Sequence, residues 1–386
     1  MILFEFEGKK LLSKAGIKVP ESQLLSSPTE KPKIKPPFVL KAQTLSGRRG
    51  KVGGVVVVEK DFNLKILEKI FEKEINGEKP ASVLVEKKIE HKQEFYLSIS
   101  YDTDFRSPVL TFSKAGGISI EDQKAEIIPI DSVSQKIDNG KIKDLPEEIG
   151  KVLPNIIKVF FENDCLLLEI NPLVLDKKGE VFALDAKIKL DDAAVVRHPE
   201  WKYPPRSVAG HKATGREIAA KKIDEGDYRG TAGSTYFDLP GDIAILASGG
   251  GGSLTAMDAL LAAGGKPANY TEYSGNPPKE KVNRLAKVVL SREGLNGLWI
   301  VGAVANFTDI YETLSGFLEA IRQVSPKPKY PIVIRRGGPR DREAFEMLKK
   351  VKDLDLHLYG SEISITESAR IMALFAKKYA TSTKRG

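Results

Sequence analysis

The sequence predicts an α/β protein of two domains, a mixed α+β domain followed by a doubly wound parallel sheet. Its 386 residues exceed what one hydrophobic core usually supports. The first half contains short alternating strands and hairpin signals, which are typical of antiparallel sheets. From Asp242 onward, buried-type strands alternate with amphipathic helices, as in βα units. We therefore expect one domain over residues 1–197, a linker over 198–238 and a second domain over 239–386.

The composition excludes several classes of protein. A chain that is 41% hydrophobic and 29% charged has the composition of a soluble globular protein. Apolar runs fall short of the roughly 20 residues that span a bilayer, and residues 1–16 lack secretory-signal features, so we expect a cytoplasmic protein without membrane insertion.

The basic residues behind the net charge of +8 are scattered along the chain, which disfavours nucleic-acid binding. The excess fits either a lysine-rich surface or attraction of polyanions such as ATP and CoA. Cys165 heads an apolar strand, so we expect a buried thiol.

The first domain begins with an entry helix and a strand–loop–strand unit. The helix covers residues 5–16, and an irregular stretch then runs to about residue 37. The strands at 38–41 and 55–58 flank a glycine-rich basic loop at 46–54. Backbone N–H groups of such a loop can approach phosphates, while Lys41 and Arg49 supply charge. A mobile basic hairpin is the alternative, and the spacing does not fit a Walker A loop.

Further strands and helices complete this domain. We expect helices near 62–76 and 145–161, and strands at 82–86, 94–101, 108–113 and 118–120. The end of the strand at 82–86, continuing to Ile89, is suited to present main-chain groups to an adenine.

A hairpin over residues 166–188 carries polar residues where alternation predicts apolar ones. A three-residue loop with Gly179 in the left-handed conformation gives three facing pairs: Asp176 with Glu180, Asn171 with Asp185, and Glu169 with Lys187. The second pair places an amide oxygen and a carboxylate about 5 Å apart, which suits Mg²⁺ with its remaining positions left to water and phosphates. A solvated hairpin face with an ordinary Glu–Lys pair is the alternative.

Residues 198–239 are polar and irregular apart from a helical run at 215–224, which places the domain junction here. His211 lies in a Gly-His-Lys-Ala stretch that superficially resembles a phosphohistidine loop. No paired carboxylate or glycine-rich frame surrounds it, so we expect a linker histidine.

The second domain repeats a strand–helix unit. Its expected strands are 242–247, 268–270, 297–301, 331–334 and 356–358, and its expected helices are 253–263, 279–291, 310–324, 342–350 and 365–379. Ligands of a doubly wound sheet bind outside the carboxyl ends of the strands, where four loops fall: 248–252, 274–276, 306–308 and 335–338. These loops offer hydroxyls, an amide and two guanidiniums beside a glycine-lined helix start, which fits a small polycarboxylate and nearly as well a phosphate. Adjacent residues of an extended segment point to opposite sides, so one of Arg335 and Arg336 should be the clamp.

Several motifs together resemble a known superfamily. EGKKLLSKAGIKVP, VLKAQTLSGRRGKVGG, EFYLSISYD, KAGGISIED and LLLEINPLVLDKKGEVFALDAKI are similar to the ATP-grasp domain of acyl-CoA synthetases (nucleoside diphosphate-forming), the superfamily of succinyl-CoA synthetase and ATP-citrate lyase. NYTEYSGNP, VANFTD and IRRGGP resemble ATP-citrate lyase and citryl-CoA synthetase. The resemblance covers nearly the whole chain and implies an ATP-grasp domain followed by a flavodoxin- or Rossmann-like CoA-ligase domain.

The resemblance also implies site residues. The nucleotide-binding positions are Lys41, Arg49, Gly50, Glu86, Lys88, Ile89 and Glu94. Asn171 and Asp185 match the Mg²⁺ ligands, and Glu169 matches a catalytic glutamate that faces the phosphohistidine loop. The citrate positions are Ser274, Gly275, Asn306, Thr308 and Arg336.

The implied activity uses ATP and Mg²⁺ to phosphorylate a histidine on a companion subunit, leading through citryl phosphate to citryl-CoA. CoA is a co-substrate bound mainly by that companion, in a hetero-oligomer. With a lyase module on the companion, citryl-CoA is cleaved to acetyl-CoA and oxaloacetate. Ala303 and Val324 stand where the lyase has a serine and a citrate-contacting tyrosine, which keeps a ligase for succinate, malate or another acid open. A non-enzymatic nucleotide-sensing scaffold is the third interpretation.

Overall fold

The computed structural model describes residues 1–45, 49–117, 125–137, 142, 145–206 and 213–383. These form two compact units, residues 1–206 and the residues from 213 on, and each is described by itself. Residues 213–238, which the sequence analysis assigned to a linker, belong to the second unit. Three predicted features lie outside the described residues: Ser46–Arg48 of the basic loop, the strand at 118–120, and His211.

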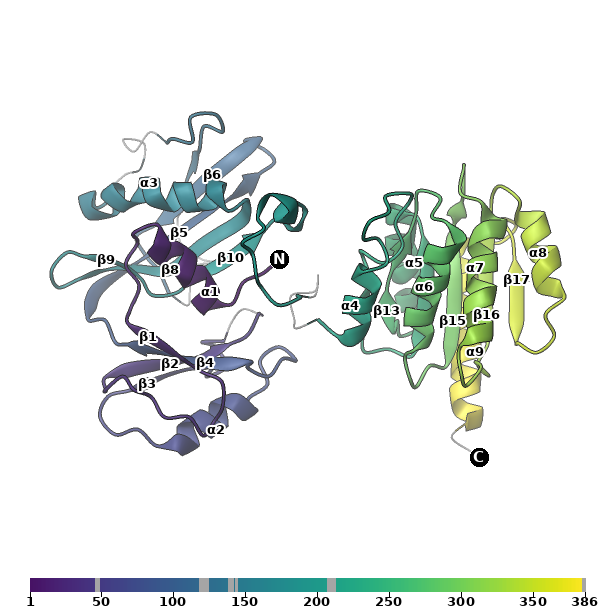
Figure 1. The fold of residues 1–386 in the computed structure, drawn as a ribbon, viewed down its shortest axis with the longest axis horizontal. Coiled ribbons are helices and arrows are strands. Elements are labelled where there is room, and N and C mark those ends of the chain that lie inside the picture. Colours follow the sequence, from purple (N-terminus) through teal and green to yellow (C-terminus); the bar gives the residue numbers. More distant parts are fainter. Residues whose placement is uncertain (46–48, 118–124, 138–141, 143–144, 207–212, 384–386) are drawn as a thin grey trace. The chain divides into compact units, whose positions relative to one another are not determined.

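The first unit contains a four-stranded antiparallel sheet in the order β1-β4-β2-β3 (Figure 1). Its strands are β1 (Ser22–Leu25), β2 (Phe38–Gln43), β3 (Val55–Val58) and β4 (Ser82–Lys87). Helix α2 (Leu64–Glu72) buries Leu67 and Ile70 in the core of this sheet. The sequence analysis expected irregular chain at β1, which exists because it pairs along the whole of its length with β4.

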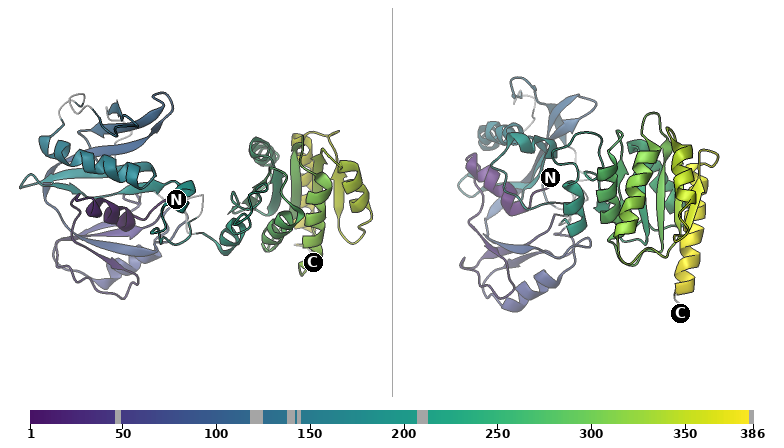
Figure 2. Two further views of the ribbon diagram at one scale, coloured as in Figure 1. Left: turned by 45° about the horizontal axis from the view of Figure 1, so that its top comes forward. Right: turned by 45° about the vertical axis from the view of Figure 1, so that its right-hand side comes forward.

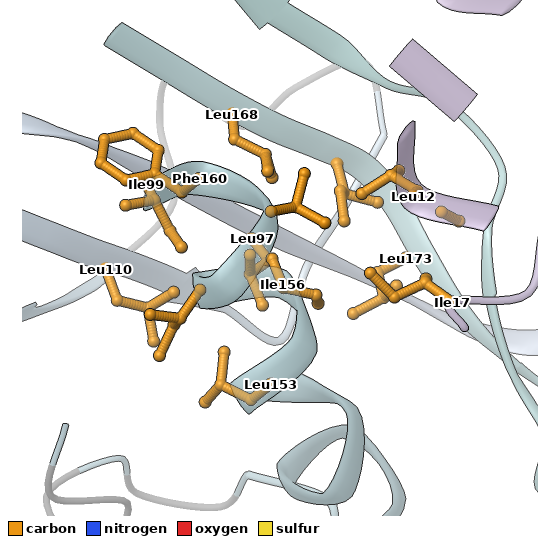
Figure 3. Packing of buried hydrophobic residues seen from close by; sticks show 14 of the residues in the cluster. Leu12, Ile17, Leu97, Ile99, Leu110, Leu153, Ile156, Phe160, Leu168 and Leu173 are labelled. Atoms are coloured by element: carbon orange, nitrogen blue, oxygen red, sulfur yellow. The ribbon is translucent and has the colours of Figure 1, made fainter. Parts of the chain in front are cut away.

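A second, six-stranded antiparallel sheet has the order β10-β8-β5-β6-β7, with β9 paired to β8. Its strands are β5 (His91–Asp102), β6 (Ser107–Ser113), β7 (Glu126–Pro129), β8 (Cys165–Asp176), β9 (Val181–Ala183) and β10 (Lys187–Leu190). Helices α1 (Glu5–Lys14) and α3 (Glu147–Glu162) cover it. Figure 3 shows how side chains such as Leu12, Ile156 and Phe160 of these helices meet Leu97 and Leu168 of the sheet. The 3-10 helix η3 (Asp192–Arg197) follows β10.

The predicted hairpin is present. Gly179 has φ +78°, the Asp176 N–H donates to the Glu180 carbonyl at 3.0 Å, and Lys187 pairs with Glu169 across β10 and β8. The described ladder is interrupted at 184–186, between β9 and β10, where Asn171 was expected to face Asp185. The Gly179 turn and the pairing of Glu169 with Lys187 are thus confirmed. The segment that carries Asp185 lies between the two strands and is not part of the ladder.

The second unit is a five-stranded parallel sheet in the order β14-β12-β15-β16-β17. Its strands are β12 (Ile243–Ser248), β14 (Glu272–Tyr273), β15 (Gly297–Val304), β16 (Ile332–Gly337) and β17 (Leu356–Tyr359). The helices are α4 (Gly215–Lys221), α5 (Gly250–Ala262), α6 (Lys279–Leu290), α7 (Ile310–Gln323), α8 (Asp341–Lys349) and α9 (Ile365–Thr383). One core forms under α4, α6, α7 and α8 and another under α5 and α9, so both faces are covered, as the two views in Figure 2 show. The predicted doubly wound sheet is confirmed, with the order of the flavodoxin type.

Three local predictions for this unit were wrong. The strand expected at 268–270 is present as β13 (Asn269–Tyr270), but it pairs antiparallel with β11 (Phe237–Asp238) instead of joining the parallel sheet, which β14 joins. Helix α5 starts at Gly250, inside the expected glycine loop. Arg335 and Arg336 lie in β16 and not in a loop, because its ladder with β15 continues through Arg335 to Gly337.

Cys165 is buried as expected, its Sγ lies 3.7 Å from the Val159 carbonyl, and burial raises the pKa of its thiol to about 12.

Within the described residues, no helix combines the length and apolarity that a membrane span requires.

Candidate functional site

Three of the predicted nucleotide-binding side chains and one predicted Mg²⁺ ligand meet in a group of buried or half-buried charges, which we name the inter-sheet cluster. It consists of Glu5 and Lys9 of α1, Lys41 of β2, Arg49, Glu86 of β4, and Asp185. Helix α1 and Asp185 belong to the six-stranded side of the unit, whereas Lys41 and Glu86 belong to the four-stranded sheet. The cluster therefore joins the two sheets.

The contacts of the cluster form a closed network of three cations and three carboxylates. Glu5 accepts from Lys9 at 2.7 Å and from Lys41 at 3.1 Å through one oxygen, and pairs with Arg49 through the other. Glu86 lies 2.6 Å from the Lys9 ammonium and 2.7 Å from that of Lys41.

At the other end, Arg49 donates to Asp185 at 2.9 Å and to the Ala42 carbonyl at 2.9 Å. Equal numbers of opposite charges and short charge-assisted bonds are what makes burial of so many ions tolerable.

Electrostatics within the cluster favour the charged forms of Glu5, Lys41 and Arg49, whereas burial outweighs the nearby carboxylates at Lys9 and lowers its pKa. Burial opposes ionisation of Glu5, yet the charges of Arg49, Lys41 and Lys9 together hold its pKa well below its usual range. Burial also acts against the Lys41 ammonium, but Glu5 and Glu86 raise its pKa. For Arg49, Asp185 and Glu5 outweigh burial and raise the pKa. The two cations that the resemblance assigns to phosphate binding are therefore charged at neutral pH.

The remaining predicted nucleotide positions lie outside this network. Lys88 pairs with Glu59 at 2.6 Å at the surface. His91 connects two others, because one ring nitrogen lies 2.9 Å from the Ile89 carbonyl and the other lies 3.1 Å from the Glu94 carboxylate. Gly50 follows Arg49, and its carbonyl accepts from the Gly53 N–H at 3.3 Å.

Glu169 lies on β8 between two strands, opposite Ser98 of β5 and Lys187 of β10. Burial raises the pKa of Glu169, Lys187 opposes this, and the negative charge of Asp185 adds to it. Asp185 therefore acts on both Glu169 and Arg49. A half-buried carboxylate with a raised pKa is a candidate for hydrogen bonding to, or proton exchange with, an incoming group.

The predicted Mg²⁺ ligands are a half-buried carboxylate that pairs with Arg49 and an amide that is bonded to the backbone. The Asn171 side chain accepts from the Gly117 N–H at 2.6 Å and donates to the Gly117 carbonyl at 3.1 Å. Asp185 keeps a side chain that is 36% exposed. Among the described residues no group of three or more His, Cys, Asp or Glu is arranged to hold a metal. One carboxylate and one amide oxygen are as many protein ligands as Mg²⁺ takes where nucleotide phosphates and water complete its shell.

In the second unit, Arg336 is fully buried on β16, and no described group accepts a hydrogen bond from any of its three guanidinium nitrogens. The guanidinium lies 5.7 Å from the centre of the Tyr273 ring. A Cβ on Gly302 would come 1.7 Å from an Arg336 nitrogen, so only glycine allows this approach. Arg336 thus ends among the carboxyl ends of β14 and β15, at the edge where ligands of such sheets bind.

Its neighbour Arg335 points elsewhere and is bonded to the backbone. Its guanidinium donates to the Gly302 carbonyl at 2.7 Å and to the Ile363 carbonyl at 3.0 Å. The two arginines therefore differ in their contacts, and the expected difference in their roles stays a prediction.

The other predicted citrate positions lie on loops at the same edge. Ser274 exchanges two backbone hydrogen bonds with Thr231, at 2.9 and 3.1 Å. Gly275 has φ +69° and packs against Gly230, which requires glycine. The loop after β14 is tied to the loop after β15, because the Asn276 side chain accepts from the Asp309 N–H at 3.1 Å. Between these ties, Asn306 is exposed and Thr308 is buried.

The sequence analysis missed Glu5, Lys9, Tyr273 and Gly302. A signal existed for the first two, because residues 5, 9 and 12 share one helix face and Leu12 is apolar, so two charges fall on a buried stripe. Tyr273 and Gly302 come close to Arg336 only through strand pairing, which no local pattern shows.

Comparison with known proteins agrees with this architecture. Residues 2–175 match the ATP-grasp domain family, and residues 213–375 match the family described as ATP citrate lyase citrate-binding. The chain is 33% identical to the ADP-forming succinate–CoA ligase subunit beta of Methanocaldococcus jannaschii over 96% of this chain and 98% of that protein. It is 32% identical to the Staphylothermus marinus subunit over 91% and 93%.

Among solved structures, the chain is similar to ATP citrate lyase from Methanothrix soehngenii in complex with citrate and coenzyme A. The TM-score is 0.75 at 24% identity, covering 97% of this chain and 99% of the other. A Methanosaeta concilii ATP citrate lyase variant in complex with (3S)-citryl-CoA also gives 0.75, at 23% identity over 96% and 98%. The fold, the two domain matches and the relatives agree, and the chain belongs to the family of ATP-grasp acid–CoA ligase subunits that includes the succinate–CoA ligase beta subunits.

Proposed function

We propose that this chain is the ATP- and citrate-binding subunit of an ATP-citrate lyase or citryl-CoA synthetase. The observation that carries the proposal is the buried guanidinium of Arg336, which lacks a described protein acceptor. A buried, unpaired charge is costly, and a carboxylate that accepts both forks of the guanidinium offsets that cost. The match of residues 213–375 to a citrate-binding domain supports a carboxylate as the missing anion.

The first unit supplies the phosphoryl transfer. When bound, ATP would supply the phosphoryl group and Mg²⁺ would neutralise much of its charge. Lys41 and Arg49 place fixed positive charge beside the phosphates, and Asp185 with Asn171 would hold the metal. Glu169 would hydrogen-bond the histidine of a companion subunit, which receives the phosphoryl group and passes it to citrate. The thiol of CoA, bound mainly by the companion, would then attack the acyl carbon of citryl phosphate and displace phosphate, which gives citryl-CoA.

A ligase for succinate or malate is the second candidate, because curated relatives at 32–33% identity are succinate–CoA ligase subunits. Of the two sequence departures, only Ala303 lies near Arg336, at the carboxyl end of strand β15 before the Asn306 loop. Val324 follows the 14-residue helix α7, which starts beside Thr308, so Val324 lies about 20 Å along the helix from that loop. The tyrosine-to-valine departure therefore bears less on the ligand site than the sequence suggested.

Isothermal titration of the full chain with citrate, succinate and malate tests the choice of acid. Citrate should bind at least tenfold more tightly than the two dicarboxylates, because it offers a further carboxylate and a hydroxyl to the polar loops. Tighter binding of succinate would replace the proposal by the second candidate.

The phosphoryl-transfer part is tested with Asp185→Ala in the presence of the companion subunit. We expect loss of ATP-dependent phosphorylation of the companion's histidine while citrate binding survives, because the citrate positions lie in the other unit. Phosphorylation at a near wild-type rate in Mg²⁺ would show that Asp185 is not a metal ligand.

A further inference from the structure

The inter-sheet cluster contains two charged residues of α1 that the proposed phosphoryl transfer does not use. Glu5 and Lys9 are each 4% exposed, less than Lys41 at 8%. Lys9 reaches from α1 to Glu86 of the four-stranded sheet, and Glu5 reaches to Lys41 of the same sheet. Both residues therefore bridge the two halves of the first unit.

Lys9 and Lys41 bind the same three acceptors. Each ammonium contacts the Glu5 carboxylate, the Glu86 carboxylate and the Leu184 carbonyl, the last at 2.7 Å from Lys9. A lysine ammonium has three N–H donors, so these acceptors take all of them, and a phosphate that binds Lys41 must replace one of the acceptors. Lys41 is consequently held from three directions, by α1, by β4 and by the segment that carries Asp185.

Glu5 also fixes the spacing of the two phosphate-binding cations. One carboxylate oxygen contacts Lys41, and the other contacts Arg49 and accepts from the Gln43 side chain at 3.2 Å. Gln43 is itself fully buried and accepts from the Phe6 N–H at 3.2 Å, so the orientation of the carboxylate is set by α1 and β2 together. Arg49 then reaches Asp185 across the gap between the sheets.

We infer that Glu5 and Lys9 are positioning residues of the nucleotide site: they hold Lys41 of β2 and Arg49 of the following loop in register with Asp185 of the segment between β9 and β10. The inference rests on the proposed function, because it takes Lys41 and Arg49 as phosphate-binding groups. A positioned pair of cations attracts a polyphosphate more strongly than the same charges spread apart, since the orientation is prepared before binding.

Two single variants separate positioning from net charge. Glu5→Gln leaves the cluster with one excess positive charge, and Lys9→Met leaves it with one excess negative charge. If only net charge matters, the first variant binds ATP more tightly and the second more weakly, and the double variant, which is neutral, returns to the wild-type affinity. If the two residues position the cations, both single variants weaken ATP binding by about 10- to 100-fold, and the double variant stays weak.

Glu7→Gln is the matched control. Glu7 is a buried glutamate of the same helix, but its carboxylate pairs with Arg206 at 2.8 Å and caps the Phe4 N–H at 2.8 Å. Its substitution should lower the melting temperature about as much as Glu5→Gln and leave ATP affinity within about twofold of wild type.

The experiment is isothermal titration of the full chain and of these variants with ATP in the presence of Mg²⁺. The temperature is kept below the lowest melting temperature of the set. A citrate titration of each variant checks that the second unit is intact. Weak ATP binding with normal citrate binding in both single variants and the double variant supports the inference. Tighter binding by Glu5→Gln, or a double variant restored to wild-type affinity, overturns it.

Two further outcomes keep the test decisive. If Glu5→Gln does not fold, Glu5→Asp retains the charge but shortens the reach, and it should still weaken ATP binding about tenfold; unchanged affinity would overturn the inference. A wild-type chain that binds no ATP would overturn the proposed nucleotide site and the inference with it. Wild-type ATP binding together with unaltered affinity in both single variants would remove only the inference.

Discussion

The two units bury cationic side chains in opposite ways. In the first unit, Lys41 and Arg49 are surrounded by carboxylates of the same chain, so their charges are balanced before any ligand arrives. In the second unit, Arg336 is buried to 0% exposure with no described acceptor, and its nearest aromatic contact is Tyr273. Arg335, one residue away, is satisfied by backbone carbonyls.

The two sites therefore differ in whether a buried charge has a partner within the protein, and this difference changes how the charge affects stability and ligand binding. A neutral network is stable by itself, orients its members and gives up a charge only at high cost. A lone buried guanidinium destabilises the ligand-free fold and gains its partner on binding, so ligand binding and stability should be strongly coupled there.

The largest effect is expected at Arg336. Loss of a bidentate charge-assisted pair costs about 2–4 kcal/mol, so Arg336→Lys should weaken citrate binding by roughly 30- to 1000-fold. Arg335→Lys should change citrate affinity little, because Arg335 serves the backbone of β15 and the Ile363 segment. Citrate titration of both variants measures the contrast, and equal tolerance at both positions would remove Arg336 from the ligand site.

The second prediction compares stability without ligand. Lys9→Met leaves carboxylates of the cluster unbalanced and should lower the free energy of unfolding by about 3–5 kcal/mol. Arg336→Met removes an unpaired buried charge and should be neutral or stabilising by about 1–3 kcal/mol. Chemical denaturation followed unit by unit gives both values. A large loss of stability in Arg336→Met would mean that the guanidinium is satisfied within the fold.

The third prediction is a pair of opposite pH effects within the first unit. Glu5 has a folded-state pKa below its usual value of 4.5, so its stabilisation is complete above that value and is lost as the pH falls below it. Glu169 has a folded-state pKa above 4.5, so the fold loses stability as the pH rises from 4.5 through that raised value.

Measurement of the free energy of unfolding at a series of pH values tests the direction of both pH effects. Glu5→Gln should flatten the loss of stability on the acid side, and Glu169→Gln should flatten the loss on the side above 4.5. The same change of slope in both variants would contradict the opposite environments that the structure assigns to these two carboxylates.

The smallest effect is expected at Lys88, a predicted nucleotide-binding residue whose side chain pairs with the exposed Glu59. Exposed ion pairs contribute little to stability, so Lys88→Met should leave the melting temperature unchanged. If Lys88 contacts the nucleotide, its ATP affinity should fall a few-fold. An unaltered ATP affinity would remove Lys88 from the site and leave the inter-sheet cluster as the main source of phosphate attraction.

Local patterns predicted most elements but not their partners. The alternation of strands and helices after Asp242 was sufficient for the doubly wound sheet, and the Gly179 turn was sufficient for the register of Glu169 with Lys187. Strand β1 and the extension of β16 through Arg336 were missed, because both depend on hydrogen bonds to a neighbouring strand that no short window contains.

What the sequence by itself determined is therefore the succession of elements, the family, and the set of residue types at each proposed site, because these follow from local periodicity, turn chemistry and motif. Only the tertiary structure decided which charges are paired. Lys9 lies 77 residues from Glu86, and Arg49 lies 136 residues from Asp185, yet each pair is in contact. Arg336 differs from Arg335 only through the strand that directs one guanidinium toward Tyr273 and the other toward backbone carbonyls. Pairing and burial are properties of the packed fold, since they depend on residues that the chain brings together from distant positions.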